Sequence, residues 1–148
     1  MMRLDKMKSL SLLEWRMIMA ASLLLPICAL CLRFWGLKRT QEMLSSDPIR
    51  LPATYPEEAM EKALQIARAV DLTALYGPYR ANCLERSLVL CRFLRRKGID
   101  FDLRIGADLS RGELFAHAWV EHAGFVLNDS ADVVERFATL ESDSDRKV

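Results

Sequence analysis

Three residues whose types together support nucleophilic catalysis occur in the second half of the chain: Cys83, His117 and Asp129. A cysteine thiolate attacks a carbonyl carbon, an imidazole takes up and returns the proton, and a carboxylate orients the imidazole and stabilises its charge. If the fold brings these side chains together, the expected chemistry is amide hydrolysis or acyl transfer through a thioester.

Cys83 stands at the predicted start of a helix. Apolar residues recur at helical spacing from residue 83 to 97, and the basic run before Gly98 is typical of a helix C-terminus. The unpaired N–H groups and the positive dipole end at Cys83 favour a thiolate over a thiol. Cys91, two turns further on, lacks this position and is interpreted as a core residue. The alternative for Cys83 itself is a buried structural thiol.

Alternating apolar residues predict strands at 100–106, 113–121 and 125–129. A three-residue hairpin loop at 122–124 would pair Glu121 with Phe125 and place His117 directly opposite Asp129, with Cβ atoms about 5 Å apart. A two-residue loop, Ala123-Gly124, would shift the register by one residue and put the two side chains on opposite faces. A three-residue loop with Gly124 in the left-handed position is a common type, and the structure tests which register forms.

Other residues are candidates for supporting the chemistry. The backbone N–H of Cys83 is a candidate donor to the oxyanion, and the loop at 79–82 is expected to supply a second donor, for which Asn82 is a candidate. Trp119 shares the predicted strand face with His117 and is a candidate for supporting the site. His122, in the hairpin turn, is expected to be solvated.

The apolar run WRMIMAASLLLPICALCLRFWG at 15–36 has three interpretations. A signal peptide fits poorly because the small-residue cleavage pattern is weak. A membrane span needs about 20 apolar residues, whereas Met17 to Leu32 supplies 16 at most, around Pro26. We expect one or two helices packed on the domain or against a partner, where Trp15, Trp35 and the flanking arginines can also rest on a membrane surface.

A further helix is predicted over 56–75, with Thr54 as its N-cap, and Gly77 and Pro78 end it. Cys28 and Cys31 form a C-x-x-C pair, but no second pair completes a zinc ligand set, so no metal is expected. They are interpreted as core residues of a protein in a reducing cytosol.

The chain has 148 residues, and its 21 basic and 20 acidic residues give a net charge of +1. This length fits one domain, and the balanced charge gives no reason to expect a nucleic-acid partner. The expected fold is α+β, with N-terminal helices and the Cys83 helix packed on a small antiparallel sheet. We expect an apolar helical segment at 1–50, the catalytic core at 51–140 with a short helix within 131–140, and a frayed tail at 141–148.

Four motifs carry a resemblance to the transglutaminase-like core, which has a papain-like arrangement: N-C-L-E-R-S-L at 82–88, G-I at 98–99, A-H-A-W-V-E at 116–121 and L-N-D at 127–129. More closely, residues 78–130 resemble the leader peptidase of bacterial lasso-peptide biosynthesis, the microcin-processing type of maturation protease. The resemblance places Cys83, His117 and Asp129 at the positions of the family's Cys-His-Asp triad. Arg86 and Ser87 match its C-L-x-R-S-L element, and Arg86 is expected to support the site.

The resemblance implies a cysteine protease without a cofactor. Such enzymes cut a ribosomally made precursor after its leader, next to a threonine, and free the core peptide's amine for a separate ATP-using cyclase. Residues 1–50 do not resemble the leader-binding domain that some members carry, so a separate leader-recognition protein is expected. The N-terminal helix is a candidate for docking that protein, the cyclase or the exporter. The expected location is cytoplasmic, with membrane association as an open alternative.

Two other classes of function stay open. The same triad serves transglutaminases and arylamine acetyltransferases, so sequence spacing does not separate hydrolysis from transfer to an amine. The second class is a scaffold of the same fold without catalysis.

Overall fold

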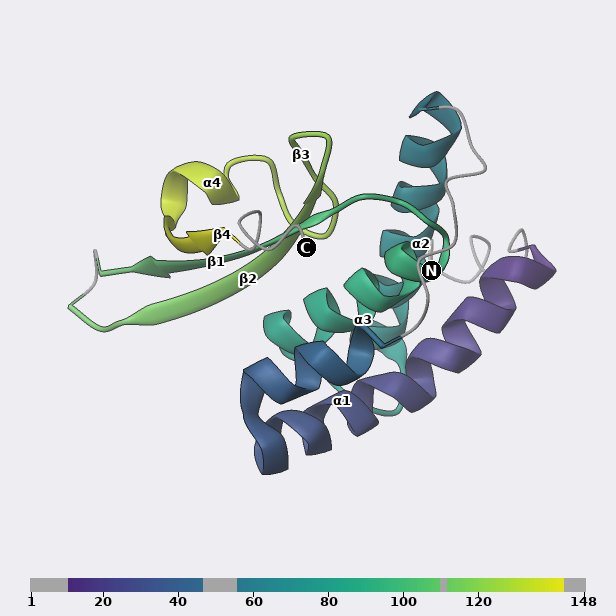
Figure 1. Ribbon diagram of the computed structural model, residues 1–148, viewed down its shortest axis with the longest axis horizontal. Coiled ribbons are helices and arrows are strands. Elements are labelled where there is room, and N and C mark those ends of the chain that lie inside the picture. The colour runs from purple at the N-terminus through teal and green to yellow at the C-terminus, as the bar shows by residue number, and fades with distance from the viewer. Residues whose placement is uncertain (1–10, 47–55, 110–111, 143–148) are drawn as a thin grey trace, which may run out of the picture.

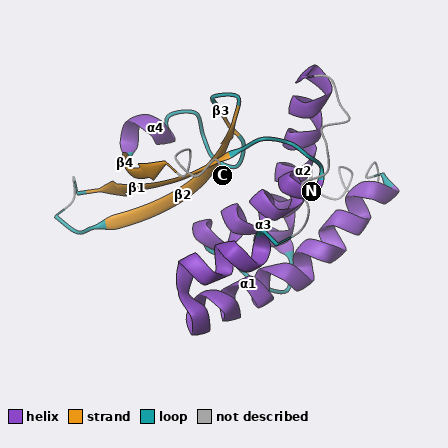
Figure 2. Cartoon of the chain, viewed as in Figure 1, coloured by secondary structure: helices purple, strands orange, loops and turns teal. Residues whose placement is uncertain are grey.

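A computed structural model describes residues 11–46, 56–109 and 112–142 of the chain. These residues form α1 (Leu12–Leu44), α2 (Pro56–Tyr76), α3 (Cys83–Arg96), β1 (Asp102–Asp108), β2 (Phe115–His122), β3 (Phe125–Val126), α4 (Val133–Arg136) and β4 (Ala138–Ser142). The three long helices pack together, and the antiparallel sheet lies beside α3 with α4 on its other side (Figures 1 and 2). This arrangement is the α+β fold expected from the sequence.

The first helix, α1, begins with a capping box formed by Ser11 and Glu14 and kinks at Gly36, whose φ of 73° is a left-handed value that favours glycine. It packs against α2 and α3 through a buried side that includes Ala21, Leu25 and Cys28. By length and composition alone, α1 is also apolar enough to cross a membrane. Its packing confirms the prediction of N-terminal helices that lie on the body of the domain.

Both cysteines of the C-x-x-C pair face the interior of the protein. Cys28 and Cys31 are buried free thiols, as predicted for core residues. Burial, together with the nearby carboxylate of Glu85 and with Cys31, raises the pKa of the Cys28 thiol to about 12, so it stays protonated at neutral pH.

The helices α2 and α3 agree with the sequence pattern. The predicted helix at 56–75 ends one residue later, at Tyr76, and its N-cap Thr54 lies outside the described residues. The apolar side chains of α3 are buried in the core, and Gly98 follows the helix with a φ of 67°, as predicted for a C-terminal glycine. The predicted core role of Cys91 is confirmed, because it is 8% exposed.

The sheet has the strand order β3-β2-β1-β4. His122 pairs with Phe125 and Glu121 with Val126, so the hairpin has a two-residue loop and the three-residue loop predicted from the sequence is wrong. Ala123 and Gly124 both have positive φ, which fits the tight two-residue turn. The prediction that His122 is solvated is also wrong, because its side chain is half-buried and forms a hydrogen bond through Nδ1 with the Asp100 carbonyl.

Beyond the hairpin, three predictions need correction. The strand expected at 125–129 stops at Val126, because the chain bends away at residues 127–129. The helix expected within 131–140 is limited to α4, and it is followed by β4, which the sequence pattern did not indicate. Residues 141 and 142 belong to β4 rather than to a frayed tail, and residues 143–148 lie outside the described part.

The packing of α1 yields a prediction with a matched control. Leu25 is fully buried, whereas Leu23 on the same helix is 67% exposed. Replacing Leu25 with Ala removes packed side-chain atoms from the core and is expected to lower the free energy of unfolding by about 2–5 kcal/mol, whereas Leu23→Ala is expected to change it by less than about 0.5 kcal/mol. Urea unfolding of the full chain measures both values. Equally small changes for the two variants would show that α1 does not pack on the domain.

Candidate active site

Cys83 is the first residue of α3, as predicted, and the local sequence fixes that start. Asn82 is the N-cap: its Oδ1 accepts from the Glu85 backbone N–H at 2.9 Å, and the Glu85 carboxylate accepts from the Asn82 backbone N–H at 3.0 Å. The Tyr79 hydroxyl donates to the same carboxylate. This capping box holds the loop at 79–82 and presents the half-buried Cys83 side chain at the positive end of the helix.

His117 and Asp129 form the predicted pair. His117 Nε2 lies 2.5 Å from Asp129 Oδ2, and both side chains are mostly buried. With the Nε2–H donating to the carboxylate, Nδ1 is the ring nitrogen left free to take up a proton. The pair therefore has the geometry of a base and the carboxylate that orients it.

The two residues meet although the register differs from the predicted one. In a continuous hairpin with a two-residue loop, they would point to opposite faces of the sheet. Pairing follows β2 only as far as Leu127, whose N–H donates to the Val120 carbonyl at 2.8 Å. The bend at residues 127–129 then frees the chain from strand geometry and turns the Asp129 carboxylate towards His117.

Three further groups hold the Asp129 carboxylate. Its Oδ1 accepts from the Ser130 N–H at 2.7 Å and from the Ser130 hydroxyl at 3.3 Å, and the Arg136 guanidinium lies 3.7 Å away. Burial raises the pKa of Asp129, but the hydrogen bonds from His117 and Ser130 outweigh it and leave that pKa below its ordinary value. The carboxylate is therefore ionised at neutral pH.

Two aromatic rings flank the His117 imidazole. The Phe137 ring stacks on it at a centroid distance of 4.9 Å, and the Trp119 ring lies at 6.3 Å. Trp119 is fully buried and its indole N–H donates to Glu121 at 2.8 Å. Gly106, opposite His117 on β1, leaves space for these rings, because a Cβ there would lie 2.8 Å from the Phe137 Cβ. Trp119 thus lies beside the imidazole, and its role in supporting the site stays a prediction.

The start of α3 is tied to the residues next to His117 and Asp129. Ser87 donates to the Ala118 carbonyl at 3.1 Å and accepts from the Asn128 amide at 3.0 Å. The Asn128 Oδ1 in turn accepts from the Val120 N–H at 2.8 Å. The backbone groups of Ala118 and Val120 point to the same edge of β2, since residues two apart share an edge. The first turns of α3 therefore contact β2 at its edge.

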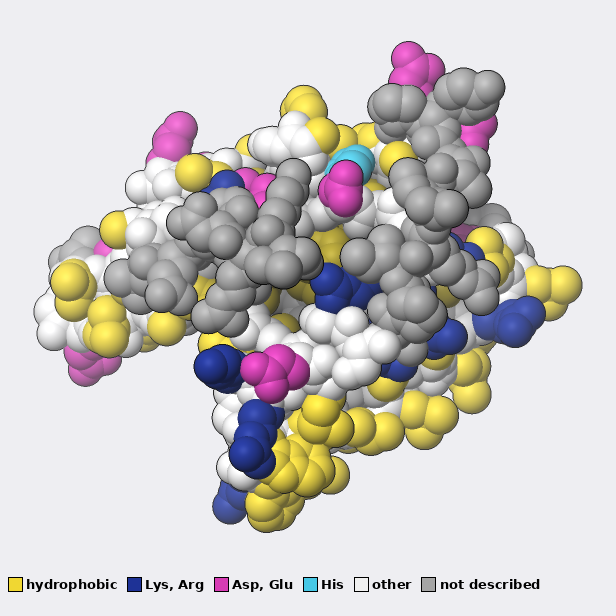
Figure 3. Space-filling model, in the orientation of Figure 1, with side chains coloured by type: hydrophobic (Ala, Val, Ile, Leu, Met, Phe, Trp, Pro, Cys, Tyr) yellow, Lys and Arg dark blue, Asp and Glu magenta, His cyan; other side chains and the backbone are white. Residues whose placement is uncertain are grey.

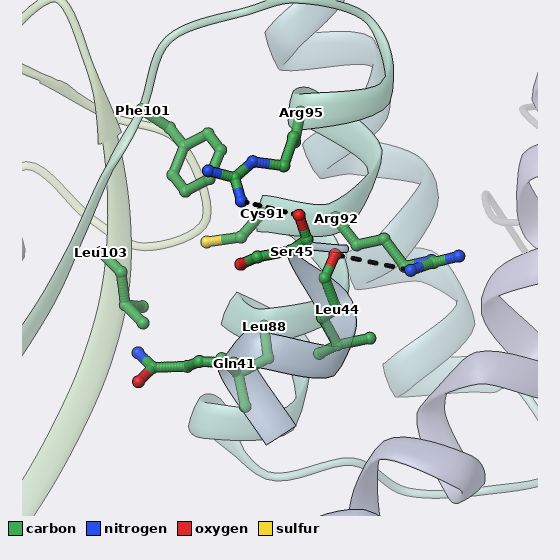
Figure 4. A pocket seen from close by; sticks show the side chains of 9 residues that line it. All are labelled: Gln41, Leu44, Ser45, Leu88, Cys91, Arg92, Arg95, Phe101 and Leu103. Carbon is green, nitrogen blue, oxygen red and sulfur yellow. Dashed lines mark hydrogen bonds between the residues drawn. The ribbon is translucent and has the colours of Figure 1, made fainter. Parts of the chain in front are cut away.

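The direction of α3 places Cys83 near the His117 end of that edge. Cys83 and Ser87 are four residues apart, so they share one side of the helix and are separated by one turn, about 5.4 Å. Further along α3, Cys91 lines a surface pocket together with Phe101 and Leu103 (Figure 4). Leu103 pairs with Val120 on β2, so Cys91 lies towards the Val120 end of β2. Cys83 is two turns earlier on α3, past Ser87, and therefore lies towards the His117 end.

Two of the three predicted residues are joined by a hydrogen bond. No hydrogen bond joins the Cys83 thiol to His117, both of which lie within the described residues. Catalytic hydrogen bonds of this kind are often long in the absence of substrate. Among the described residues, no group of three His, Cys, Asp or Glu side chains is placed to hold a metal ion.

Arg86 and Asp71 form a charged pair close to Asp129. Arg86 donates to the Asn128 carbonyl at 3.4 Å, and its Nε lies 3.8 Å from Asp71 on α2, too far for a hydrogen bond. Burial raises the pKa of Asp71 to about 6, against the attraction of Arg86 and with the help of Asp129. Arg86 thus contacts the segment that carries Asp129, and its supporting role stays a prediction.

Asn82 has a structural role that bears on its predicted one. Besides accepting at Oδ1, its amide donates one hydrogen to Glu85 at 2.9 Å, which leaves one amide hydrogen for an oxyanion. Asn82 as an oxyanion donor stays a prediction. Asn128, Ser130, Phe137 and Asp71 were not singled out by the sequence pattern. Of these, only Asn128 had a signal, because it stands inside the L-N-D motif.

Comparison with known families agrees with this geometry. A family model described as the transglutaminase-like superfamily matches residues 28–142, from within α1 to the end of β4. The chain therefore belongs to the transglutaminase-like superfamily, which includes cysteine proteases and acyltransferases. No curated protein and no solved structure matches the chain at a significant level.

The raised pKa of Asp71 predicts how stability changes with pH. Folding raises this pKa from 3.8 to about 6, so the folded state favours the protonated carboxyl group of Asp71. The free energy of unfolding therefore falls as the pH rises from about 4 to 6. At about 1.36 kcal/mol per pKa unit, the loss is at most about 3 kcal/mol. In Asp71→Asn this loss is absent, so the variant is expected to become more stable relative to wild type between pH 4 and pH 7.

Urea unfolding at a series of pH values measures this difference. Glu61→Gln, an exposed carboxylate on the same helix, is the matched control and is expected to show no comparable trend. A difference between wild type and Asp71→Asn that is constant with pH would contradict the assignment.

Proposed function

We propose that this protein is a cysteine peptidase of papain-like mechanism, with Cys83 as nucleophile, His117 as base and Asp129 as the carboxylate that orients it. The observation that carries the proposal is the hydrogen bond between His117 and Asp129, in a chain whose α3 begins at Cys83 and is anchored to the neighbours of both residues. Membership of the transglutaminase-like superfamily supports the same chemistry.

The mechanism follows from these groups. His117 Nδ1 takes the proton of the Cys83 thiol, and the thiolate sulfur attacks the scissile carbonyl carbon to form a tetrahedral oxyanion. The backbone N–H of Cys83, which lies in the first turn of α3 and so has no partner within the helix, donates to that oxyanion. The imidazolium returns its proton to the leaving amine as the C–N bond breaks. Water, deprotonated by His117, then hydrolyses the thioester and releases the free thiol.

The substrate we propose is the precursor of a lasso peptide, cut at the end of its leader. This part of the proposal is supported by the motifs around Cys83, His117 and Asp129, which resemble those of the leader peptidases. A separate leader-recognition protein would present the precursor, and an ATP-dependent cyclase would use the amine that cleavage frees. The reaction would take place in the cytoplasm and needs no cofactor.

Mass spectrometry of the cognate precursor, incubated with this protein and its leader-recognition partner, tests the proposal. Wild type is expected to cut at one site, and Cys83→Ala is expected to lose at least roughly a thousandfold in rate, because no other group supplies the nucleophile. Cys91→Ala, which removes a buried thiol of the same helix, is the matched control and is expected to retain cleavage.

The products also separate hydrolysis from acyl transfer. In water labelled with oxygen-18, hydrolysis places one labelled oxygen in the new carboxylate, whereas transfer to an amine gives a product joined to that amine without label. Equal cleavage by wild type and Cys83→Ala would show that Cys83 is structural.

A further inference from the structure

The outer side of α1 carries a row of large apolar side chains that the rest of the described chain does not cover. These side chains recur every three or four residues and are 42–72% exposed: Trp15, Met19, Leu23, Ile27, Leu30 and Phe34. At 1.5 Å per residue, this outer face of α1 is about 28 Å long. Continuous exposed apolar surface of this kind is typical of a site that contacts a membrane or another protein.

The opposite side of α1 belongs to the core. Ala21, Leu25 and Cys28 are at most 2% exposed and pack in one cluster with Ile66 of α2 and Leu88 of α3. If α1 crossed a bilayer alone, the apolar residues of α2 and α3 in this cluster would be exposed to water. The helix α2 cannot enter the bilayer with α1, because it carries exposed charged residues. The packing therefore favours a helix that lies along a surface with only its outer face in contact.

Charge on α1 indicates what kind of surface it is. Two exposed basic residues, Arg16 and Arg33, lie within the span of the apolar row, and two more, Lys38 and Arg39, follow the kink at Gly36. No acidic residue occurs between Trp15 and Thr40. Figure 3 shows apolar side chains along the lower edge of the molecule, over α1, with basic side chains beside them. Such a combination matches the anionic headgroups of a bilayer, which attract basic residues next to an apolar helix face.

Aromatic residues stand at both ends of the row. Trp15 lies near its start, and Phe34 and Trp35 lie near its end, all at least 42% exposed. Aromatic rings settle at the boundary between headgroups and acyl chains, so a helix held at this boundary by its buried inner side can place all three rings there.

We infer that the outer face of α1 docks the protein on an anionic membrane surface, with the helix parallel to the bilayer. The apolar row enters the upper part of the acyl region, and Arg16 and Arg33 beside it reach lipid phosphates. The sheet lies on the other side of α3 from α1, so the His117–Asp129 pair stays accessible to a peptide when the protein is docked (Figure 1). This docking does not depend on the proposed peptidase activity.

Sedimentation of the full chain with vesicles tests the inference. Binding is expected with vesicles of phosphatidylcholine and phosphatidylglycerol, and it is expected to weaken with pure phosphatidylcholine and with rising salt. Leu23→Glu is expected to lower partitioning at least roughly tenfold, because a charge replaces a side chain inserted into lipid. Leu75→Glu, at a position on α2 that is 55% exposed, is the matched control and is expected to bind like wild type. Arg33→Gln is expected to bind anionic vesicles about fivefold more weakly and to bind pure phosphatidylcholine vesicles like wild type.

Four results would overturn the inference. The first is no sedimentation with anionic vesicles, and the second is equal loss in Leu23→Glu and Leu75→Glu. The third is protein that resists extraction at alkaline pH, which indicates a spanning helix. The fourth is a dimer in solution that Leu23→Glu converts to a monomer, which indicates that a second copy covers this face. Circular dichroism confirms that each variant is folded, and precursor cleavage without vesicles tests the peptidase separately.

Discussion

The buried Asn128 side chain makes the hydrogen bonds on which the candidate site depends. Its amide oxygen accepts from Val120 on β2, and its amide nitrogen donates to Ser87 on α3, so one side chain joins the sheet, the helix and the segment that leads to Asp129. Asn128 is 5% exposed, and a partner left unpaired there would cost about 1–3 kcal/mol. The position of the Cys83 helix relative to His117 and Asp129 is therefore fixed by a polar contact as well as by apolar packing.

This contact also explains why the pair forms in a register that would separate it in a regular hairpin. In a longer β3, a backbone carbonyl would accept the Val120 N–H. Here the Asn128 side-chain oxygen accepts it instead, so β3 ends early and the chain bends. Asp129, released from the alternation of a strand, turns back to His117, and Ser130 and Arg136 hold its other oxygen. The early end of β3 is thus what allows the Asp129 carboxylate to reach His117.

The sequence predicted what depends on local pattern. Apolar spacing and cap residues located α2, α3 and the first two strands, and the start of α3 placed Cys83 at a helix N-terminus. The register could not be predicted, because His122 suits both a loop and a strand end, and the L-N-D motif does not show that the Asn128 side chain takes the place of a backbone acceptor. Asp71 also gave no signal, since it becomes important only when α2 packs beside Arg86. Contacts between residues distant in the chain decide these features, and no local pattern records them.

The central claim is that His117, oriented by Asp129, activates Cys83, and the rate of Cys83 alkylation tests it without a substrate. Peptide mapping after brief iodoacetamide treatment at neutral pH measures this rate beside those of the buried thiols of Cys28, Cys31 and Cys91. The account predicts that Cys83 reacts first and that His117→Ala slows it at least roughly tenfold, with a smaller effect for Asp129→Asn. A Cys83 rate that is the same in wild type and both variants would contradict the account.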